Sequence, residues 1–404
     1  MYKLSGDMNK EINKISEEII SLRRCFHRNP ELGFEEYRTS EKICSFLREN
    51  SIPYEKMSKT GVTAFLKGAG EITIGLRADM DALPVEEKTG LPFASGNKGI
   101  MHACGHDGHM AVVLGVAKVL KKYEKNLRFN VKFIFQPSEE RPPGGAAMMI
   151  KEGVLDDLDY MLGFHFFPTL PLFKMWIGKG PVMANADFFS IRVTGRGGHG
   201  ASPHLADDTI ACSSYLVTCL QTIISRNLDP IKSGVLSVCG ISGGTAYNVI
   251  PDEVLLKGTV RTLEDSVQEN IKGLIKAKAE EVCRIFGCKS HFKYDKYVPS
   301  CINDNYFSGA VEKASLKILS PRNIADYHPI MGGEDFAFFS RKKPSCYIFA
   351  GIGNKFGDNH SSNFSIDERV LPYTAGFFAS LITQLDICSG IDSKSRKKAK
   401  SPKK

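Results

Sequence analysis

The order of hydrophobic and polar positions predicts a chain in which helices and strands alternate. Apolar residues recur at helical spacing over residues 8–28, and Pro30 ends that helix. Further helices are predicted at 36–49 and 109–122. Short apolar strands are predicted at 62–67, 72–77, 131–136 and 160–164, and a Gly-rich loop at 95–108. This alternation indicates an α/β domain with a largely parallel or mixed sheet covered by helices.

The pattern changes after Pro181. A half-buried strand at 187–194 is followed by a helix, two strands, a helix and a strand, at 207–226, 234–241, 253–262, 265–286 and 290–297. This is the β-α-β-β-α-β order of a ferredoxin-like α+β domain. A helix at 303–320 and a buried strand at 345–350 then resume the first pattern. We therefore predict a discontinuous α/β domain, 1–184 and 299–390, interrupted by a smaller domain at 185–298.

The composition is that of an ordinary globular protein. The chain has 404 residues, 42% hydrophobic and 24% charged, which is enough for two domains. It contains no apolar run of 18 residues and no signal-peptide pattern at its start, so we expect no membrane partner and a cytoplasmic location. The eleven cysteines lack the spacing of a disulfide framework and are expected to be reduced thiols.

The net charge of +8 is concentrated at the C-terminal end. The last eleven residues carry seven Lys or Arg and no acid, which leaves about +1 for the rest of the chain. Residues 391–404 are therefore predicted to be a disordered basic tail, with weak attachment to nucleic acid or anionic lipid as the alternative. No zinc-finger or RNP-like motif accompanies the tail, so we expect no specific nucleic-acid partner.

Candidate metal ligands follow the predicted strands. Glu139 and Glu140 end the apolar run VKFIFQPSEE, and successive side chains leaving a strand point in opposite directions. One carboxylate can therefore bind metal while the other moves a proton. Cys104 and His106 share a Gly-rich loop, His165 ends an apolar strand, and His360 lies in a late polar loop. Each signal alone also fits a buried or solvated residue, but together they indicate a hydrolytic metal site.

Other polar residues could support such a site. Asp79 and Asp81 end a predicted strand, where they could hold metal-bound histidines by hydrogen bonds or cap a turn. In the predicted smaller domain, the Gly-rich segment 195–204 presents His199. Together with Asn248 and Arg261, it offers donors for an oxyanion and for a carboxylate.

Eight features in this order closely resemble the M20 metallopeptidase family. They are RADMDALP, MHACGHDGH, QPSEE, GFHFFP, GRGGHGASPH, GGTAYNVIPD, GGEDFAFF and the late His360. The most similar branch is the amidohydrolases, which includes hippurate hydrolase, N-acyl-amino-acid deacylases and auxin-conjugate hydrolases. The resemblance spans about residues 10 to 388 and is far more specific for the family than for a substrate.

The resemblance implies a two-domain fold, with a metal site in the α/β domain and a smaller lid domain that forms homodimers or homotetramers. It implies that two divalent cations bind to Cys104, His106, Glu140, His165 and His360. It also implies that Glu139 is the general base and that His199 is a transition-state donor. Mixed thiolate, imidazole and carboxylate ligands suit Zn, Mn, Co or Ni better than Mg or Ca.

The expected activity is hydrolysis of the amide bond of N-acyl amino acids, either hippurate-like or N-acetyl. One alternative is a dipeptidase or aminopeptidase of the same fold. The other is a catalytically silent, ligand-binding relative, which the intact Glu139 and the five apparent ligands disfavour.

Overall fold

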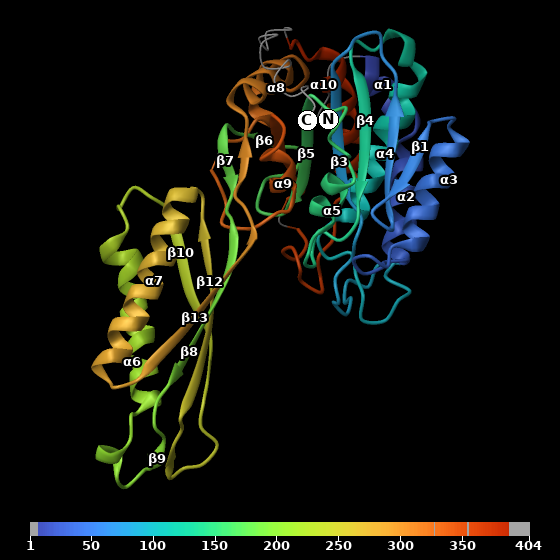
Figure 1. Ribbon diagram of the computed structural model, residues 1–404. Coiled ribbons are helices and arrows are strands. Elements are labelled where there is room, and N and C mark those ends of the chain that lie inside the picture. The colour runs from blue at the N-terminus through green and yellow to red at the C-terminus, as the bar shows by residue number, and fades with distance from the viewer. Residues whose placement is uncertain (1–6, 327, 354, 388–404) are drawn as a thin grey trace, which may run out of the picture.

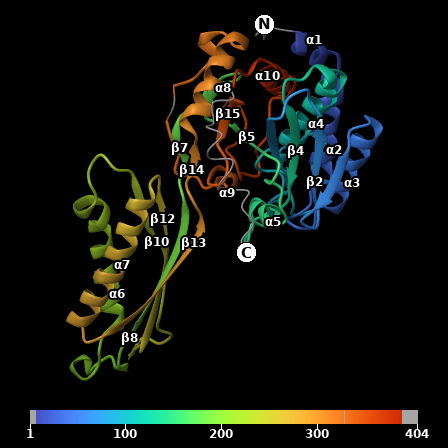
Figure 2. The ribbon, with the colours of Figure 1, turned by 45° about the horizontal axis from the view of Figure 1, so that its top comes forward.

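The computed structural model of the protein describes residues 7–326, 328–353 and 355–387 (Figure 1). The predicted basic tail, 391–404, lies outside these residues. Two units are visible, a larger one built on a seven-stranded sheet and a smaller one built on a four-stranded sheet (Figures 1 and 2).

The large sheet is mixed, as the alternating pattern predicts. Its strands, in spatial order, are β1 (Tyr54–Met57), β2 (Gly61–Leu66), β4 (Asn130–Gln136), β3 (Thr73–Asp79), β5 (Tyr160–Phe167), β15 (Ser345–Gly351) and β6 (Met175–Ile177). The central strands β4, β3, β5 and β15 are parallel, and the outer pairs are antiparallel. Every residue of β3 and β15 is buried, which is typical of parallel strands covered on both faces.

Helices cover both faces of this sheet. One hydrophobic cluster joins the sheet to α1 (Asp7–Lys14), α2 (Ser16–Arg28), α3 (Tyr37–Glu49), α4 (His106–Lys122), α8 (Asn305–Ile318) and α10 (Val370–Gln384). A second cluster joins the opposite face to α5 (Gly145–Lys151) and α9 (Phe336–Ser340). Short helical turns lie at Glu124–Asn126, Pro203–Leu205, Ile223–Asn227 and Pro321–Asn323.

The smaller unit has its own hydrophobic cluster. Its elements are β8 (Ala186–Thr194), α6 (Thr209–Thr222), β10 (Gly234–Ser242), β12 (Glu253–Thr262), α7 (Asp265–Ile285) and β13 (Lys289–Val298). The strands form an antiparallel sheet in the order β10-β12-β8-β13, so the ferredoxin-like order of elements is observed. Two small pairs complete the structure: β7 (Gly180–Met183) with β14 (Cys301–Asn303), and β9 (Gly198–His199) with β11 (Val249–Ile250). The exact domain boundaries, with the smaller domain at 185–298, remain a prediction.

Three local details differ from the pattern-based expectation. The first helix is divided at Ile15 into α1 and α2. The helix expected from about residue 109 begins at His106, because Gly105 adopts a left-handed conformation (φ 92°) and turns the chain into α4. The last helix, α10, was not predicted, because it is buried on nearly all sides and lacks the polar face that a periodic pattern requires.

No helix in the described part of the chain has the length and apolar character needed to cross a membrane.

Candidate metal centre and active site

The predicted site residues gather at one edge of the large sheet. Asp79 ends β3, Glu139 and Glu140 follow β4, and His165 lies near the end of β5. These three strands are parallel neighbours, so their carboxyl ends meet at the same edge, which is where open α/β sheets bind ligands. The chain returns to this edge at His360, whose backbone N–H donates to the carbonyl oxygen of Ala103 at 2.7 Å.

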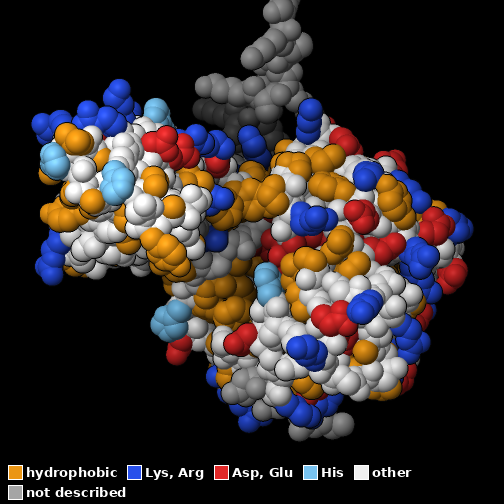
Figure 3. All heavy atoms as spheres, turned by 90° about the horizontal axis from the view of Figure 1, so that it is seen from below, with side chains coloured by type: hydrophobic (Ala, Val, Ile, Leu, Met, Phe, Trp, Pro, Cys, Tyr) orange, Lys and Arg blue, Asp and Glu red, His pale blue; other side chains and the backbone are white. Residues whose placement is uncertain are grey.

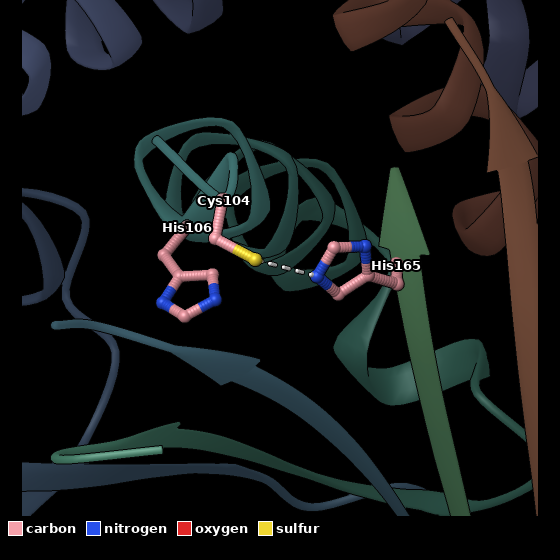
Figure 4. A group of neighbouring side chains, drawn as sticks. All are labelled: Cys104, His106 and His165. Carbon is pink, nitrogen blue, oxygen red and sulfur yellow. Dashed lines mark hydrogen bonds between the residues drawn. The ribbon is translucent and has the colours of Figure 1, made fainter. Parts of the chain in front are cut away.

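Cys104, His106 and His165 form the innermost part of the site (Figure 4). The Cys104 Sγ lies 3.2 Å from His165 Nε2. The other ring nitrogen of His165 lies 2.7 Å from the carbonyl oxygen of Phe166, so Nδ1 carries the hydrogen and Nε2 presents its lone pair to the site. His106 is oriented in the same way, with Nδ1 2.8 Å from the carbonyl oxygen of Asp81.

The remaining predicted ligands adjoin this group. His360 Nε2 lies 3.1 Å from Glu140 Oε1. One ligand atom each from Cys104, Glu140 and His360 lie within 4.8 Å of one another, and the same holds for Cys104, His106 and His165. Five side chains from four segments of the chain thus share one centre, with Cys104 common to both groups.

These donors fit divalent cations. The His106 Nε2 is buried and has no hydrogen-bond partner among the described residues, although a buried polar atom normally has one. Burial, followed by the charges of Glu140 and Glu139, raises the pKa of the Cys104 thiol well above its usual range. A cation is the group that would hold this sulfur as a thiolate and satisfy the free imidazole nitrogen.

Glu139 lies beside the predicted ligands but has a different acidic environment. Its Oε1 accepts a hydrogen bond from the backbone N–H of Asp335 at 3.3 Å. Glu334 and Asp335, which precede α9, present carboxylate oxygens within 4.8 Å of one on Glu139. Burial, followed by the charge of Glu334, raises the pKa of Glu139 well above its usual range. This carboxyl group therefore has a high affinity for protons.

Two buried carboxylates hold the loop that carries Glu139 and Glu140. Asp81 accepts the backbone N–H groups of Glu139 and Glu140 at 2.9 and 3.0 Å. Glu36 accepts the N–H of Ser138 at 2.8 Å, and Ser138 adopts a positive φ of 48°. Burial raises the pKa of Glu36 to about 7. Three successive N–H groups are thus fixed. Asp81 Oδ1 also lies 3.4 Å from Nδ1 of the predicted ligand His106.

His109 was not identified from the sequence as a site residue. Its Nδ1 donates to Asp79 Oδ1 at 2.6 Å, and its Nε2 accepts the N–H of Phe166 at 3.1 Å. Both ring nitrogens are therefore occupied, and the ring orients β5 beside His165. Asp79 thus bonds directly to His109, and its other oxygen, Oδ2, lies 3.6 Å from Nε2 of the predicted ligand His106. The spacing of His106 and His109, three residues apart on a helix, was the signal available in the sequence.

Arg77 was also missed, and it connects the acidic residues around the site. It is fully buried in β3, and its guanidinium donates to Asp79 Oδ2 at 2.6 Å, Glu334 Oε1 at 2.9 Å and Asp335 Oδ1 at 2.9 Å. A fourth bond, at 2.8 Å, reaches Gln136 Oε1. This group of a buried cation and several carboxylates is not visible in the sequence, because Glu334 and Asp335 lie more than 250 residues from Arg77.

We expect Arg77→Met to lower the free energy of unfolding by about 3–5 kcal/mol, because it leaves buried carboxylates without their counter-ion. Urea unfolding followed by circular dichroism would measure the loss. Arg192→Met removes an exposed partner of Glu253 and should lower stability by well under about 1 kcal/mol. Equal stability losses in the two variants would contradict the role given to Arg77.

A cavity of about 350 Å³ opens onto the predicted ligands. Its polar lining includes Cys104, Glu139, Glu140, His165 and His360. Its apolar and aromatic lining comes from both units: Phe167, Met183, Ala186, Phe188, Tyr297, Val298, Ile330 and Phe349. Hydrophobic side chains gather along the hollow between the units (Figure 3). Arg261, on β12, lines the same cavity, and burial lowers the pKa of its guanidinium.

His199 and Asn248 lie elsewhere. Both line a separate cavity with Gly198, Thr245 and Pro251. His199 is exposed on β9, at the tip of the smaller unit that is distant from the large sheet (Figure 1). Its Nδ1 accepts the backbone N–H of Ala201 at 3.0 Å. The structure therefore separates these two predicted residues from the other members of the site.

Comparison with known proteins identifies relatives along most of the chain. The model of peptidase family M20/M25/M40 matches residues 75–384. An N-acetyl-L-cysteine deacetylase of Bacillus subtilis is 40% identical, over 89% of this chain and 86% of that protein. A hippurate hydrolase of Campylobacter jejuni is 37% identical, over 92% and 97%. The crystal structure of a dinuclear metal-binding peptidase of the M20 family from Bacillus subtilis superposes with a TM-score of 0.81 at 34% identity, covering 92% of this chain and 98% of that one.

Proposed function

Because the chain belongs to peptidase family M20/M25/M40, and is therefore a metal-dependent hydrolase of linear amides, we propose that its substrates are N-acyl amino acids. The products are a carboxylate and a free amino acid. The observation that carries this proposal is the convergence of Cys104, Glu140, His165 and His360 on a cavity that also contains Glu139.

Cys104, His106, Glu140, His165 and His360 would hold two divalent cations, as the dinuclear relative supports. When bound, such cations supply Lewis-acid chemistry, which lowers the pKa of water and polarises a carbonyl group. The identity of the cations is proposed as Mn, Zn, Co or Ni from the mixture of ligand types.

Glu139 is the proposed general base. Its carboxylate adjoins the ligands, and the N–H of Asp335 fixes Oε1. We infer that Glu139 takes a proton from the attacking water and delivers it to the nitrogen of the amide as the C–N bond breaks.

The lining of the cavity supports an anionic substrate with an apolar acyl group. Phe167, Met183 and Phe349 provide an apolar wall, which suits an acyl chain or ring. Arg261 is the cationic residue of the lining, and we propose that it pairs with the carboxylate of the substrate.

His199 and Asn248 would act from a second subunit or after closure of the two units. The proposed role of His199 is donation to the oxyanion of the tetrahedral intermediate. Its position far from the cavity of its own chain supports a homodimer or homotetramer formed through the smaller unit.

The test is hydrolysis of hippurate and of N-acetyl amino acids in the presence of Mn²⁺, with the released amino acid as the readout. We expect turnover of at least one of these classes. Cleavage of dipeptides alone would favour the peptidase alternative. Tight binding of all these compounds without turnover would favour a silent, ligand-binding relative.

A further inference from the structure

We propose that the Tyr297 hydroxyl donates a hydrogen bond to the oxygen of the scissile carbonyl group, a catalytic contact made from within the same chain. This inference rests on the proposed amide hydrolysis. It concerns a residue that none of the sequence motifs contains, and it adds a donor to the one expected from His199.

The first observation is a local irregularity in β13. The pairing of β13 with β8 runs regularly from Lys289 to Lys296, and it shifts register between Lys296 and Val298. Tyr297 is therefore the extra residue of a β-bulge. Bulges turn a side chain away from the regular alternation of a strand, and they are frequent beside active sites.

The second observation is where the side chain lies. Tyr297 lines the cavity that contains Cys104, Glu139 and Glu140, and its ring packs against Phe188 with centroids 5.8 Å apart. It is thus one of the groups that the smaller unit contributes to this cavity, together with Phe188 and Arg261.

The third observation is the state of the hydroxyl group. The Tyr297 hydroxyl oxygen is buried and has no hydrogen-bond partner within the described residues. A buried hydroxyl without a partner is destabilising, and phenylalanine would fill the same aromatic wall without that penalty. A group in the substrate that accepts a hydrogen bond would explain why the hydroxyl is present.

The position of Tyr297 in the cavity indicates which substrate group is the acceptor. Burial, followed by the charges of Asp335, Glu139 and Glu140, raises the pKa of Tyr297, so the hydroxyl remains protonated and can only donate to an anion. Arg261 is the proposed partner of the substrate carboxylate, and the reacting carbonyl must lie beside Glu139, in the cavity that Tyr297 also lines. The hydroxyl keeps its proton throughout, and no bond to it forms or breaks.

The test compares Tyr297→Phe with the wild type on the linear amide that the wild type cleaves fastest. We expect kcat to fall by about 10²-fold, the effect of losing one oxyanion donor, with KM changed by less than about threefold. A phosphonate analogue of that substrate, which mimics the tetrahedral intermediate, should bind more weakly by a similar factor. The midpoint of urea unfolding should stay the same or rise.

Tyr294→Phe is the matched control. Tyr294 lies on the same strand, but its hydroxyl donates to Asp187 Oδ2 at 2.6 Å inside the smaller unit. Its loss should lower the unfolding midpoint and leave kcat unchanged. Unchanged kcat and analogue binding in Tyr297→Phe, or a rise in KM alone, would overturn the proposal. Failure of the wild type to cleave any N-acyl amino acid would count against the proposed substrate and not against Tyr297.

Discussion

Glu139→Gln should reduce kcat by about 10²–10⁴-fold and leave the bound metal in place. The amide of glutamine has nearly the shape of the carboxylate, so the N–H of Asp335 keeps an acceptor. It cannot take a proton from water, however, and proton transfer is the role that we propose for this side chain. Steady-state kinetics and metal analysis of the purified variant would measure the two effects.

Glu140→Gln is the companion variant, because Glu139 and Glu140 are adjacent in the loop that follows β4. Glu140 shares a candidate ligand group with Cys104 and His360, so its neutralisation should lower metal occupancy, and activity should return in part at high metal concentration. If Glu139→Gln lost metal while Glu140→Gln retained it, the assignment of base and ligand would be reversed.

His199→Ala should lower kcat by about 10²–10³-fold without affecting metal content or the unfolding midpoint. His199 is exposed and lies in a cavity separate from the metal ligands, so its loss should not disturb either of them. His204→Ala, an exposed histidine of the neighbouring short helix, is the matched control and should retain full kcat. Unchanged kcat in His199→Ala would mean that this histidine has no part in catalysis.

Mixing inactive variants would show which subunit supplies His199. A mixed dimer of His199→Ala and Glu139→Gln chains contains one site with both an intact base and a partner's intact histidine. We expect activity to reappear as subunits exchange, because the structure places His199 far from the cavity of its own chain. No recovery in dimers that demonstrably exchange would indicate that His199 reaches its own cavity when the two units close.

The fold was largely predictable from the sequence, because its strands and amphipathic helices carry distinct periodicities. The mixed α/β fold is confirmed, and the ferredoxin-like order of elements around β8 and β12 is observed. The pattern failed at α10, where burial removes the polar face, and at the start of α4, where the left-handed Gly105 sets the boundary.

The candidate ligands could be predicted for a different reason. Cys104 precedes α4, Glu140 follows β4 and His165 lies near the end of β5, and parallel strands bring such positions to one edge of a sheet. The surrounding residues could not be predicted, because their roles depend on partners that are distant in the chain. Arg77 resembles any charged strand residue until Glu334 and Asp335 are seen to contact it. The position of His199 in the smaller domain, apart from the ligands, was predicted, and the structure adds that it lines a separate cavity.

The central claim, a hydrolase that depends on metal held around Cys104, is tested most directly by adding metal back to demetallated protein. The protein would be treated with a chelator, dialysed and titrated with Mn²⁺ or Zn²⁺ while hippurate hydrolysis is followed. We expect no activity at the start and a rise to a plateau near two equivalents per chain, as in a dinuclear site. Cys104→Ala should bind less metal and fail to reach that plateau. Full activity in demetallated protein would contradict the account.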